Sequence, residues 1–324
     1  MNKPEPRIVI LDAATYGDVA LTTVTGTWDC TVHQVTHAEQ TRARLAGRTI
    51  AITNKVEINE SVLNSPDARD LKLIAVAATG TDIIDKEAAA RRGVTVCNVP
   101  GYASQSVAQF TMALILELAS RASSYAAAVK AGEWQKSPVF TLLSFPNLEL
   151  HGKKLGIIGY GNIGRTVAQM ASGFGMEILI GGRPGSPTPS PDRLLLTELF
   201  RQADFVSLHC PLTPETRNLV NQESLASMKR SAFLVNTARG ALIDEPALVE
   251  ALRTNVIAGA ALDVVTQEPP SADQPIIVAA NNLDNLIVTP HTAWSAREAR
   301  QRLIEEVREN VAAFLQGRER NHVA

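Results

Sequence analysis

The sequence has few cysteines and no cysteine pattern that would bind a metal. Its 324 residues include only Cys30, Cys97 and Cys210, which are widely separated and odd in number. Scattered cysteines of this kind are typical of reduced thiols, and they argue against a disulfide framework or a zinc site. We therefore expect no bound metal and a location in the cytoplasm.

An excess of charge of one sign and long hydrophobic runs are also missing. The 31 Lys and Arg residues are balanced by 33 Asp and Glu residues, for a formal net charge of -2, whereas a dedicated nucleic-acid-binding domain is more often strongly basic. No apolar run reaches the roughly 20 residues of a membrane-spanning helix. Residues 1–6 lack the apolar core of a signal peptide. We therefore expect neither nucleic acid nor a membrane among the partners.

What the sequence does contain is a repeated alternation of short apolar runs and helix-like stretches. In the first hundred residues the apolar runs are 8–11, 49–53, 73–77 and 94–97. A second series has its runs at 155–158, 178–180, 205–208, 232–236, 258–262 and 286–289. Short buried strands that alternate with helices indicate parallel sheets covered on both faces. Since the length also suits two domains, the predicted fold class is α/β with two doubly wound parallel sheets.

The predicted helix over 104–120 is apolar almost all round. Such a helix must be buried on every side, either in the core of its own chain or against a second subunit, and we take it as an indication of a homodimer. The last predicted helix, 296–315, carries many charges that fit a solvent-exposed face. Between them, Trp134 and Phe140 fit a substrate pocket and a core equally well.

A glycine-rich turn joins the strand 155–158 to a predicted helix over 162–174. It reads Gly159-Tyr160-Gly161-Asn162-Ile163-Gly164. In such a turn the first glycine allows a tight bend, the second lets the backbone approach a pyrophosphate, and the third lets the helix pack closely on the strand. The helix N-terminus offers N–H groups and a partial positive charge to the phosphates. We therefore predict a dinucleotide-binding site here, with a purely structural glycine turn as the alternative.

The end of the next strand, 178–180, predicts which dinucleotide is bound. An NAD-dependent enzyme usually has Asp or Glu there to accept hydrogen bonds from the ribose hydroxyls. This sequence has Gly182 and Arg183 instead. Without a carboxylate there is less repulsion against the 2′-phosphate of NADP, and a guanidinium can pair with that phosphate. We predict NADP as the preferred cofactor and NAD as the second; an exposed loop position is the alternative for Arg183.

Three side chains at the ends of later strands form a set that suits keto-acid reduction. This reaction needs an anchor for the substrate carboxylate, a group that polarises the ketone oxygen, and an acid that protonates it. Arg239 can supply the first two through its forked, permanent charge, although a loop arginine is more often a surface ion-pair partner. Glu268 and His291 follow the next two strands, and a carboxylate beside an imidazole fixes its tautomer and favours its protonated form. The sequence therefore predicts these three residues as the catalytic group.

The other histidines are expected to play lesser parts. His209 follows the strand 205–208 and is expected to contact the cofactor without a chemical role. A structural role is expected for His33, His37, His151 and His322. No serine or cysteine stands in a nucleophile-elbow setting, which argues against a hydrolase.

Together these motifs resemble the D-isomer-specific 2-hydroxyacid dehydrogenase family, from the first strand to the last helix. The glycine turn, Thr237-Ala238-Arg239-Gly240, Asp263 with Glu268-Pro269, and Pro290-His291 match the blocks of that family in order. Within the family the chain is most similar to glycerate dehydrogenases, also called hydroxypyruvate or glyoxylate reductases. The segments that carry this closer similarity are 53–56, 78–82, 98–102 and 292–294.

The resemblance implies a role for each matching residue. His291 would be the acid/base, Glu268 its partner and Arg239 the substrate anchor. The substrate would also contact His291, Trp294 and the backbone amides of Ala78, Thr79 and Gly80. Besides the six residues of the glycine turn, the cofactor would be lined by Gly182, Arg183, His209, Cys210, Pro211, Thr216, Thr237, Ala238 and Asp263.

The resemblance also implies that the domains are not sequential. A flavodoxin-like substrate-binding domain would comprise residues 1–99 plus 293–324, and a Rossmann-type dinucleotide-binding domain would be inserted over 100–292. The cleft between them would close on the ligand and expel water. Phe110 departs from the pattern, because close relatives often carry histidine or another polar residue there.

The expected activity is the reduction of hydroxypyruvate or glyoxylate to the D-2-hydroxy acid with hydride from NAD(P)H. The alternatives on the same fold are a nucleotide sensor or corepressor without activity, a formate dehydrogenase and a phosphoglycerate dehydrogenase. The complete set of Arg239, Glu268 and His291 favours catalysis. The formate enzymes of the family carry glutamine where Glu268 stands.

Overall fold

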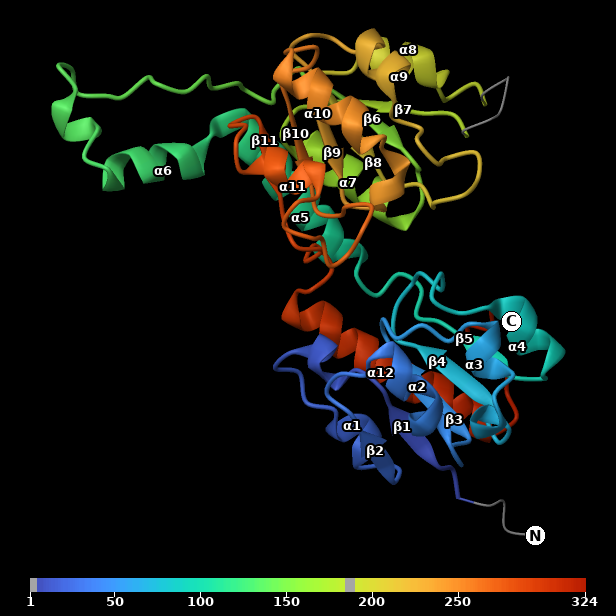
Figure 1. Cartoon of the computed structure of the whole chain (residues 1–324). Coiled ribbons are helices and arrows are strands. Elements are labelled where there is room, and N and C mark those ends of the chain that lie inside the picture. Colours follow the sequence, from blue (N-terminus) through green and yellow to red (C-terminus); the bar gives the residue numbers. More distant parts are fainter. Residues whose placement is uncertain (1–4, 184–189) are drawn as a thin grey trace. The chain divides into compact units, whose positions relative to one another are not determined.

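The structure is a computed structural model that describes residues 5–183 and 190–324. The chain divides into two compact units, each built around a parallel sheet (Figure 1). Unit 1 comprises Met1–Ala103 and Ser295–Ala324, and unit 2 comprises Ser104–Trp294. Among the described residues no helix is long and apolar enough to cross a membrane, and no three His, Cys, Asp or Glu side chains are grouped to hold a metal ion.

Unit 1 has a five-stranded parallel sheet in the order β2–β1–β3–β4–β5, which is the order of flavodoxin-like folds. Its strands are β1 (Ile8–Ile10), β2 (Cys30–Val32), β3 (Ile50–Thr53), β4 (Leu73–Val76) and β5 (Thr95–Cys97). Its helices are α1 (Thr22–Thr25), α2 (Ala38–Leu45), α3 (Glu60–Leu63), α4 (Lys86–Arg91) and α12 (Arg297–Leu315), with 3-10 turns at η1 (Ala13–Tyr16) and η2 (Pro66–Ala68). Because β1, β3 and β4 are buried along their whole length, their sequences read as continuous apolar runs.

The last helix of the chain belongs to the sheet of unit 1. α12 packs on α1 and β4 and crosses the sheet in Figure 1. Its buried residues recur along one face, and its charges lie on the other. Beyond the helix, the N–H of Val96 in β5 donates to the carbonyl oxygen of Ala324 at 2.6 Å. The C-terminal residues therefore cover the edge of this sheet.

Unit 2 has a six-stranded parallel sheet in the order β11–β10–β9–β8–β6–β7. Its strands are β6 (Lys154–Ile158), β7 (Glu177–Ile180), β8 (Phe205–Leu208), β9 (Phe233–Asn236), β10 (Gly259–Leu262) and β11 (Leu286–Val288). Its helices are α5 (Ser104–Ser120), α6 (Ala122–Lys130), α7 (Asn162–Gly173), α8 (Leu196–Gln202), α9 (Gln222–Ser227), α10 (Glu245–Arg253) and α11 (Pro275–Ala280), with 3-10 turns at η3 (Trp134–Lys136) and η4 (Gly240–Leu242). The strand order reverses at β6, and ligands of such sheets bind at the carboxyl ends of the strands beside that reversal.

The apolar helix α5 is buried within unit 2 itself. It packs on α7, β9 and β10, and most of its apolar residues are inaccessible. Phe110 is only partly buried. The core of its own chain therefore accounts for the apolar faces of α5 without a second subunit.

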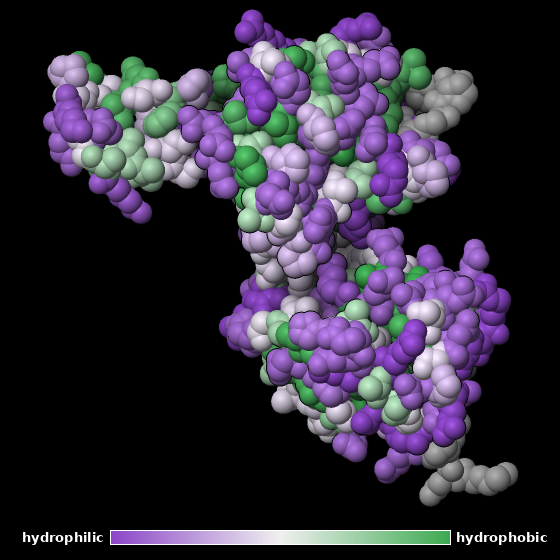
Figure 2. All heavy atoms as spheres, in the orientation of Figure 1, coloured by the Kyte–Doolittle hydropathy of each residue, from purple (hydrophilic) through white to green (hydrophobic). Residues whose placement is uncertain are grey.

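The segment after α5 is the part of unit 2 that leaves apolar side chains in solvent. We call residues 122–148 the arm; it comprises α6, η3 and the strand-free segment that follows, and it stands away from the sheet of unit 2 (Figure 1). Trp134 is 51% exposed and Phe140 is 90% exposed, so the interpretation of these two residues as core aromatics is wrong. The apolar atoms of the arm are visible as green spheres among purple ones in Figure 2.

Candidate active site and cofactor-binding turn

The glycine turn brings the ends of β6 and β8 into backbone contact. Gly159 has a φ of +98°, and a Cβ at this position would lie 2.4 Å from the backbone of His209 and Cys210. A Cβ at Gly164 would lie 2.2 Å from the carbonyl oxygen of Gly159. The first and third glycines are therefore required by the fold of the turn itself.

Gly161 has no such requirement from the protein. A Cβ at Gly161 would meet no atom within 4 Å in the part of the chain that the structure describes. The residue is exposed and is the N-cap of α7, and as a glycine it has no side chain with which to cap that helix. The first N–H groups of α7 are thus left for an anion, and the open space beside Gly161 suits a pyrophosphate that approaches the backbone. The turn fits a bound dinucleotide.

The three glycines should therefore respond differently to alanine. We expect Gly161→Ala to weaken binding of the reduced nicotinamide cofactor by at least about 10-fold, because the added methyl group occupies the space for the pyrophosphate. Its thermal unfolding should match that of the wild type. Gly164→Ala, as the matched comparison, should lower the unfolding temperature, since its methyl group meets backbone. Fluorescence titration and calorimetry measure the two effects, and unchanged cofactor affinity in Gly161→Ala would contradict this account of the turn.

Several residues predicted to line the cofactor are engaged in local hydrogen bonds. The hydroxyl of Thr216 donates to the carbonyl oxygen of Pro211 at 2.8 Å and fixes the turn after β8. The hydroxyls of Thr237 and Thr111 lie 2.9 Å apart. The N–H of Ala238 donates to the side chain of Asn236 at 3.0 Å. These bonds shape the strand ends around the glycine turn.

Gly182 and Arg183 follow β7. The N–H of Gly182 donates to Leu194 at 2.8 Å, and Arg183 is exposed. A hydrogen bond from Thr213 and, to a lesser extent, the guanidinium of Arg183 lower the pKa of Glu215. Arg183 therefore has an acidic residue nearby, which the sequence alone did not indicate.

His209 lies at the end of β8 with one ring nitrogen bonded and the other not. Its Nε2 lies 2.9 Å from the hydroxyl of Ser207, whereas its Nδ1 is buried and has no hydrogen-bond partner among the described residues. Burial lowers the pKa of His209 to about 4. The imidazole is therefore neutral near pH 7, which fits a contact residue and not a proton donor.

The lowered pKa of His209 predicts a pH dependence of stability. Between about pH 6.5 and about pH 4 the unfolded chain binds a proton at His209 that the folded chain does not bind, so the free energy of unfolding should fall as the pH falls through this range. From about pH 7.5 to about pH 5 the loss should be roughly 2 kcal/mol. Urea unfolding of the wild type and of His209→Gln at the two pH values measures it. Equal pH dependence in the two proteins would contradict a neutral, buried imidazole.

The predicted acid/base and its partner meet in unit 2. His291 follows β11 and Glu268 lies in the loop after β10, and Nδ1 of His291 is 2.5 Å from Oε2 of Glu268. The side chains are 25% and 33% exposed, so the imidazole is reachable. Since Nδ1 faces the carboxylate, Nε2 is the nitrogen left for a substrate.

The backbone at His291 is held in an unusual conformation. His291 has a φ of +51°, which few residues with side chains adopt. Its N–H donates to the carbonyl oxygen of Asp263 at 2.7 Å, and its carbonyl oxygen accepts the indole N–H of Trp294 at 2.9 Å. The buried carboxylate of Asp263 accepts from the N–H groups of Thr292 and Ala293 at 2.9 and 2.8 Å. Asp263 and Trp294, predicted as ligand contacts, thus also fix the loop that presents His291.

Arg239 follows β9 and is half-buried. One guanidinium nitrogen, Nη1, donates to the carbonyl oxygen of Ala238 at 2.8 Å, and the carbonyl oxygen of Arg239 accepts from the side chain of Asn236 at 2.8 Å. The ends of three adjacent strands, β9, β10 and β11, therefore carry Arg239, Glu268 and His291 in that order.

Comparisons with known proteins show the family of the chain. A sequence model described as the D-isomer specific 2-hydroxyacid dehydrogenase, NAD binding domain matches residues 112–293. The chain is 44% identical over 285 residues to a glycerate dehydrogenase of Methylorubrum extorquens, with 88% of each chain covered. It is 35% identical over 319 residues to a hydroxypyruvate reductase of Blautia hydrogenotrophica, with 96% of this chain and 97% of the relative covered.

The chain belongs to the D-isomer specific 2-hydroxyacid dehydrogenase family. A solved structure of an acyclic imino acid reductase in complex with NADPH and D-Arg superimposes with a TM-score of 0.84 at 30% identity, covering 98% of this chain and 100% of that one. As a member of the family, the protein is an oxidoreductase that uses a nicotinamide cofactor. The predicted family and fold class are confirmed.

In this 2-hydroxyacid dehydrogenase the residues predicted to hold the substrate carboxylate lie in unit 1, after β4. The carbonyl oxygen of Ala78 accepts from the N–H of Val99 at 2.9 Å, and that of Thr79 accepts from the side chain of Asn98 at 2.7 Å. Among the described residues, the N–H groups of Ala78, Thr79 and Gly80 donate to no protein acceptor. Successive N–H groups without a protein acceptor are available to bind an anion.

Sequence reasoning did not assign two buried carboxylates of this dehydrogenase. In unit 1, Asp12 accepts from the N–H groups of Asn54 and Lys55 at 3.0 and 2.6 Å, while burial raises its pKa. In unit 2, Glu245 accepts from the N–H of Thr266 at 2.6 Å. Each carboxylate ties a loop to a neighbouring strand end or helix, and no motif marked either residue.

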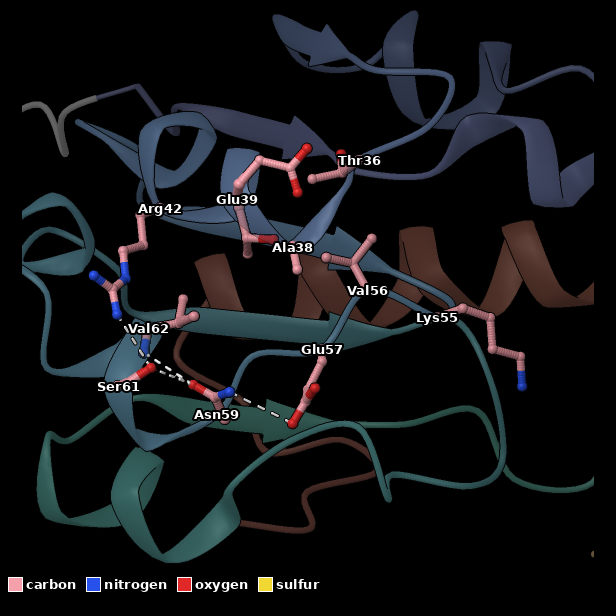
Figure 3. A pocket seen from close by; sticks show the side chains of 11 residues that line it. Thr36, Ala38, Glu39, Arg42, Lys55, Val56, Glu57, Asn59, Ser61 and Val62 are labelled. Atoms are coloured by element: carbon pink, nitrogen blue, oxygen red, sulfur yellow. Dashed lines mark hydrogen bonds between the residues drawn. The ribbon is translucent and has the colours of Figure 1, made fainter. Parts of the chain in front are cut away.

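A cavity of about 520 Å³ in unit 1 contains none of the predicted site residues. Figure 3 shows its polar side chains bonded to one another: Arg42 to Ser61 at 3.2 Å, Ser61 to Asn59 at 2.8 Å and Asn59 to Glu57 at 3.5 Å, with Lys55 pointing away. Charges of both signs line it, and its polar groups bind each other. We assign it no ligand.

Proposed function

We propose that the protein reduces hydroxypyruvate, and glyoxylate as a second substrate, to the D-2-hydroxy acid with NAD(P)H. The observation that carries this proposal is the contact of 2.5 Å between His291 and Glu268, in the same unit as a turn that fits a dinucleotide. An imidazole–carboxylate pair beside a hydride donor is what ketone reduction requires. A glycerate dehydrogenase and a hydroxypyruvate reductase among the relatives act on the two sides of one such reaction, which supports this substrate class.

Three residues of the chain would each have a separate role in the reduction of the keto acid. When bound at the glycine turn, the reduced nicotinamide would supply the hydride that is added to C2 of the keto acid. Arg239 binds the keto acid and stabilises the negative charge that develops on the ketone oxygen, because its guanidinium stays charged and donates in a fixed fork. His291 donates a proton from Nε2 to that oxygen. Glu268, which accepts the hydrogen bond from Nδ1, stabilises the imidazolium before the transfer and fixes the ring.

For unit 1 we propose a binding role. The N–H groups of Ala78, Thr79 and Gly80 would hold the substrate carboxylate, because they have no protein acceptor among the described residues. We accordingly propose residues 1–99 plus 293–324 as the substrate-binding domain and residues 100–292 as the dinucleotide-binding domain.

The preference for NADPH over NADH is also a proposal, and it rests on Arg183. Arg183 is exposed after β7, where no carboxylate of the strand end is present to repel a 2′-phosphate. We expect Arg183→Asp to lower the NADPH/NADH ratio of kcat/KM by about 10-fold to 100-fold, since it removes an ion pair and adds repulsion. Because Glu215 lies nearby, Glu215→Gln should shift the ratio modestly the other way. An unchanged ratio in Arg183→Asp would refute the preference.

A panel of keto acids tests the proposed substrate. Initial rates with hydroxypyruvate, glyoxylate, pyruvate and phenylpyruvate, each with NADPH and NADH, should give the highest kcat/KM for hydroxypyruvate and NADPH. One hydroxymethyl group separates hydroxypyruvate from glyoxylate, so their kcat/KM values should differ by only about 10-fold or somewhat more. Cofactor binding without turnover of any keto acid would favour a nucleotide sensor on the same fold.

We further propose that the arm packs against a second copy of the chain. Its exposed apolar side chains are too many for a solvent-exposed segment of one chain. They are Val129, Trp134, Val139, Phe140, Leu143 and Leu148. Light scattering should give the mass of a dimer, and a monomeric mass at micromolar concentration would refute this role of the arm.

A further inference from the structure

A buried glutamate outside the proposed chemistry holds the loop that carries Glu268. Glu245 is the first residue of α10 and only 9% exposed. Its Oε1 accepts the backbone N–H of Thr266 at 2.6 Å, and its Oε2 accepts from Nε2 of Gln274 at 3.2 Å. Burying a carboxylate costs free energy unless hydrogen bonds replace its water. Both oxygens of Glu245 have such bonds, and the N-terminus of α10 adds a favourable field.

Further hydrogen bonds connect the loop at Thr266 to the imidazole of His291. The residue before Thr266, Val265, donates its N–H to Oε1 of Glu268 at 3.0 Å. The other oxygen of Glu268, Oε2, lies 2.5 Å from Nδ1 of His291. A continuous path of backbone and hydrogen bonds therefore runs from Glu245 through the loop to the side chain that orients His291.

The same loop touches the segment that begins at Arg239. A Cβ at Gly240 would lie 2.0 Å from the carbonyl carbon of Val265 and 2.4 Å from the N atom of Thr266, so the two backbones are in direct contact. Gly240 follows Arg239 and starts η4, which leads into α10 and Glu245. The segment 239–245 thus contacts the loop that carries Glu268 twice, through Gly240 near its start and through Glu245 at its end.

We propose that Glu245 is a positioning residue that fixes the loop 265–268 and so holds Glu268 against His291. Because the same loop contacts Gly240, Glu245 also fixes Glu268 relative to Arg239. The inference rests on the proposed function, because it assigns a purpose to the alignment of that catalytic group. Glu245 itself touches neither substrate nor cofactor in this role. Its effect on the reaction passes entirely through Glu268.

The first test compares two substitutions of Glu245. Glu245→Ala should lower kcat with hydroxypyruvate and NADPH by about 10-fold to 100-fold, because a displaced acid/base pair loses its alignment. KM and the affinity for NADPH should stay near those of the wild type. Glu245→Gln should keep most of the activity. The carboxamide oxygen introduced by this substitution can still accept from the N–H of Thr266. Its NH2 group can donate to Oε1 of Gln274, which is buried without a partner among the described residues.

A matched control distinguishes loss of the hydrogen bonds of Glu245 from loss of a negative charge at a helix N-terminus. Glu223 is an acidic residue in the first turn of α9 and is exposed. Glu223→Ala should leave kcat unchanged. If Glu245→Ala does not fold, Gln274→Met replaces it, since it releases the other oxygen of Glu245 and should lower kcat several-fold.

A double-mutant cycle with Glu268→Gln tests whether Glu245 affects kcat through Glu268. If Glu245 acts through Glu268, Glu245→Ala should change kcat by less than about 2-fold in the Glu268→Gln background. The same fold-change in both backgrounds, or wild-type activity of Glu245→Ala, would overturn the positioning role alone. Wild-type activity of Glu268→Gln would overturn the proposed function itself, so the two failures are distinguishable.

Discussion

His291→Asn should lower kcat for hydroxypyruvate reduction by about 100-fold to 10,000-fold, the usual contribution of a general acid. Asparagine tolerates the positive φ that His291 adopts, so the loop held by Asp263 and Trp294 should keep its conformation. The amide cannot deliver a proton to the ketone oxygen. The loss should therefore appear in kcat, while the affinity for NADPH and the thermal unfolding stay close to those of the wild type.

His322→Asn is the control for this experiment. His322 is exposed in unit 1 and has no role in the proposed chemistry, so its replacement should leave kcat unchanged. Near-normal kcat in His291→Asn would remove the proton-transfer role from this imidazole. If the unfolding temperature of His291→Asn fell strongly while kcat stayed near that of the wild type, the residue would be structural.

The second large effect is expected at Arg239. Arg239→Met should lower kcat/KM by about 1,000-fold or more, because it removes both the anchor for the keto acid and the donor that stabilises the developing oxyanion. Arg239→Lys retains the charge but not the fork, and it should recover only part of the loss. In both variants KM should rise and kcat should fall.

The control for Arg239 lies in the same unit. Arg253→Met removes an exposed arginine at the end of α10, and its steady-state kinetics should match those of the wild type. If Arg239→Met raised KM alone, Arg239 would contribute binding without stabilising the transition state.

Much of the fold could be predicted because its strands are buried on both faces. The runs that became β1, β3 and β4 of unit 1 are entirely inaccessible, so hydrophobicity alone marks them. β2 was missed, because Cys30–Val32 is a short edge strand with partly exposed side chains. An edge strand of three residues leaves no pattern that separates it from a loop.

The predicted catalytic residues share a simple signal: each follows a strand, and strands β9, β10 and β11 are neighbours. Glu245 gave no such signal. A glutamate in the first turn of a helix normally faces solvent and interacts with the helix dipole, and nothing in the sequence shows that this one turns inward to Thr266. The hydrogen bonds of Asp263 to the backbone around His291 were likewise invisible, since they depend on the path of the loop.

The fate of the transferred hydrogen tests the central claim most directly. The protein is incubated with hydroxypyruvate and NADPH that carries deuterium at the reactive carbon of its nicotinamide, and the product is analysed by chiral chromatography and mass spectrometry. The account predicts D-glycerate with one deuterium at C2 for each NADPH consumed, while the hydroxyl proton comes from His291 and so from solvent. Unlabelled glycerate, the L-isomer, or consumption of NADPH without glycerate would contradict it.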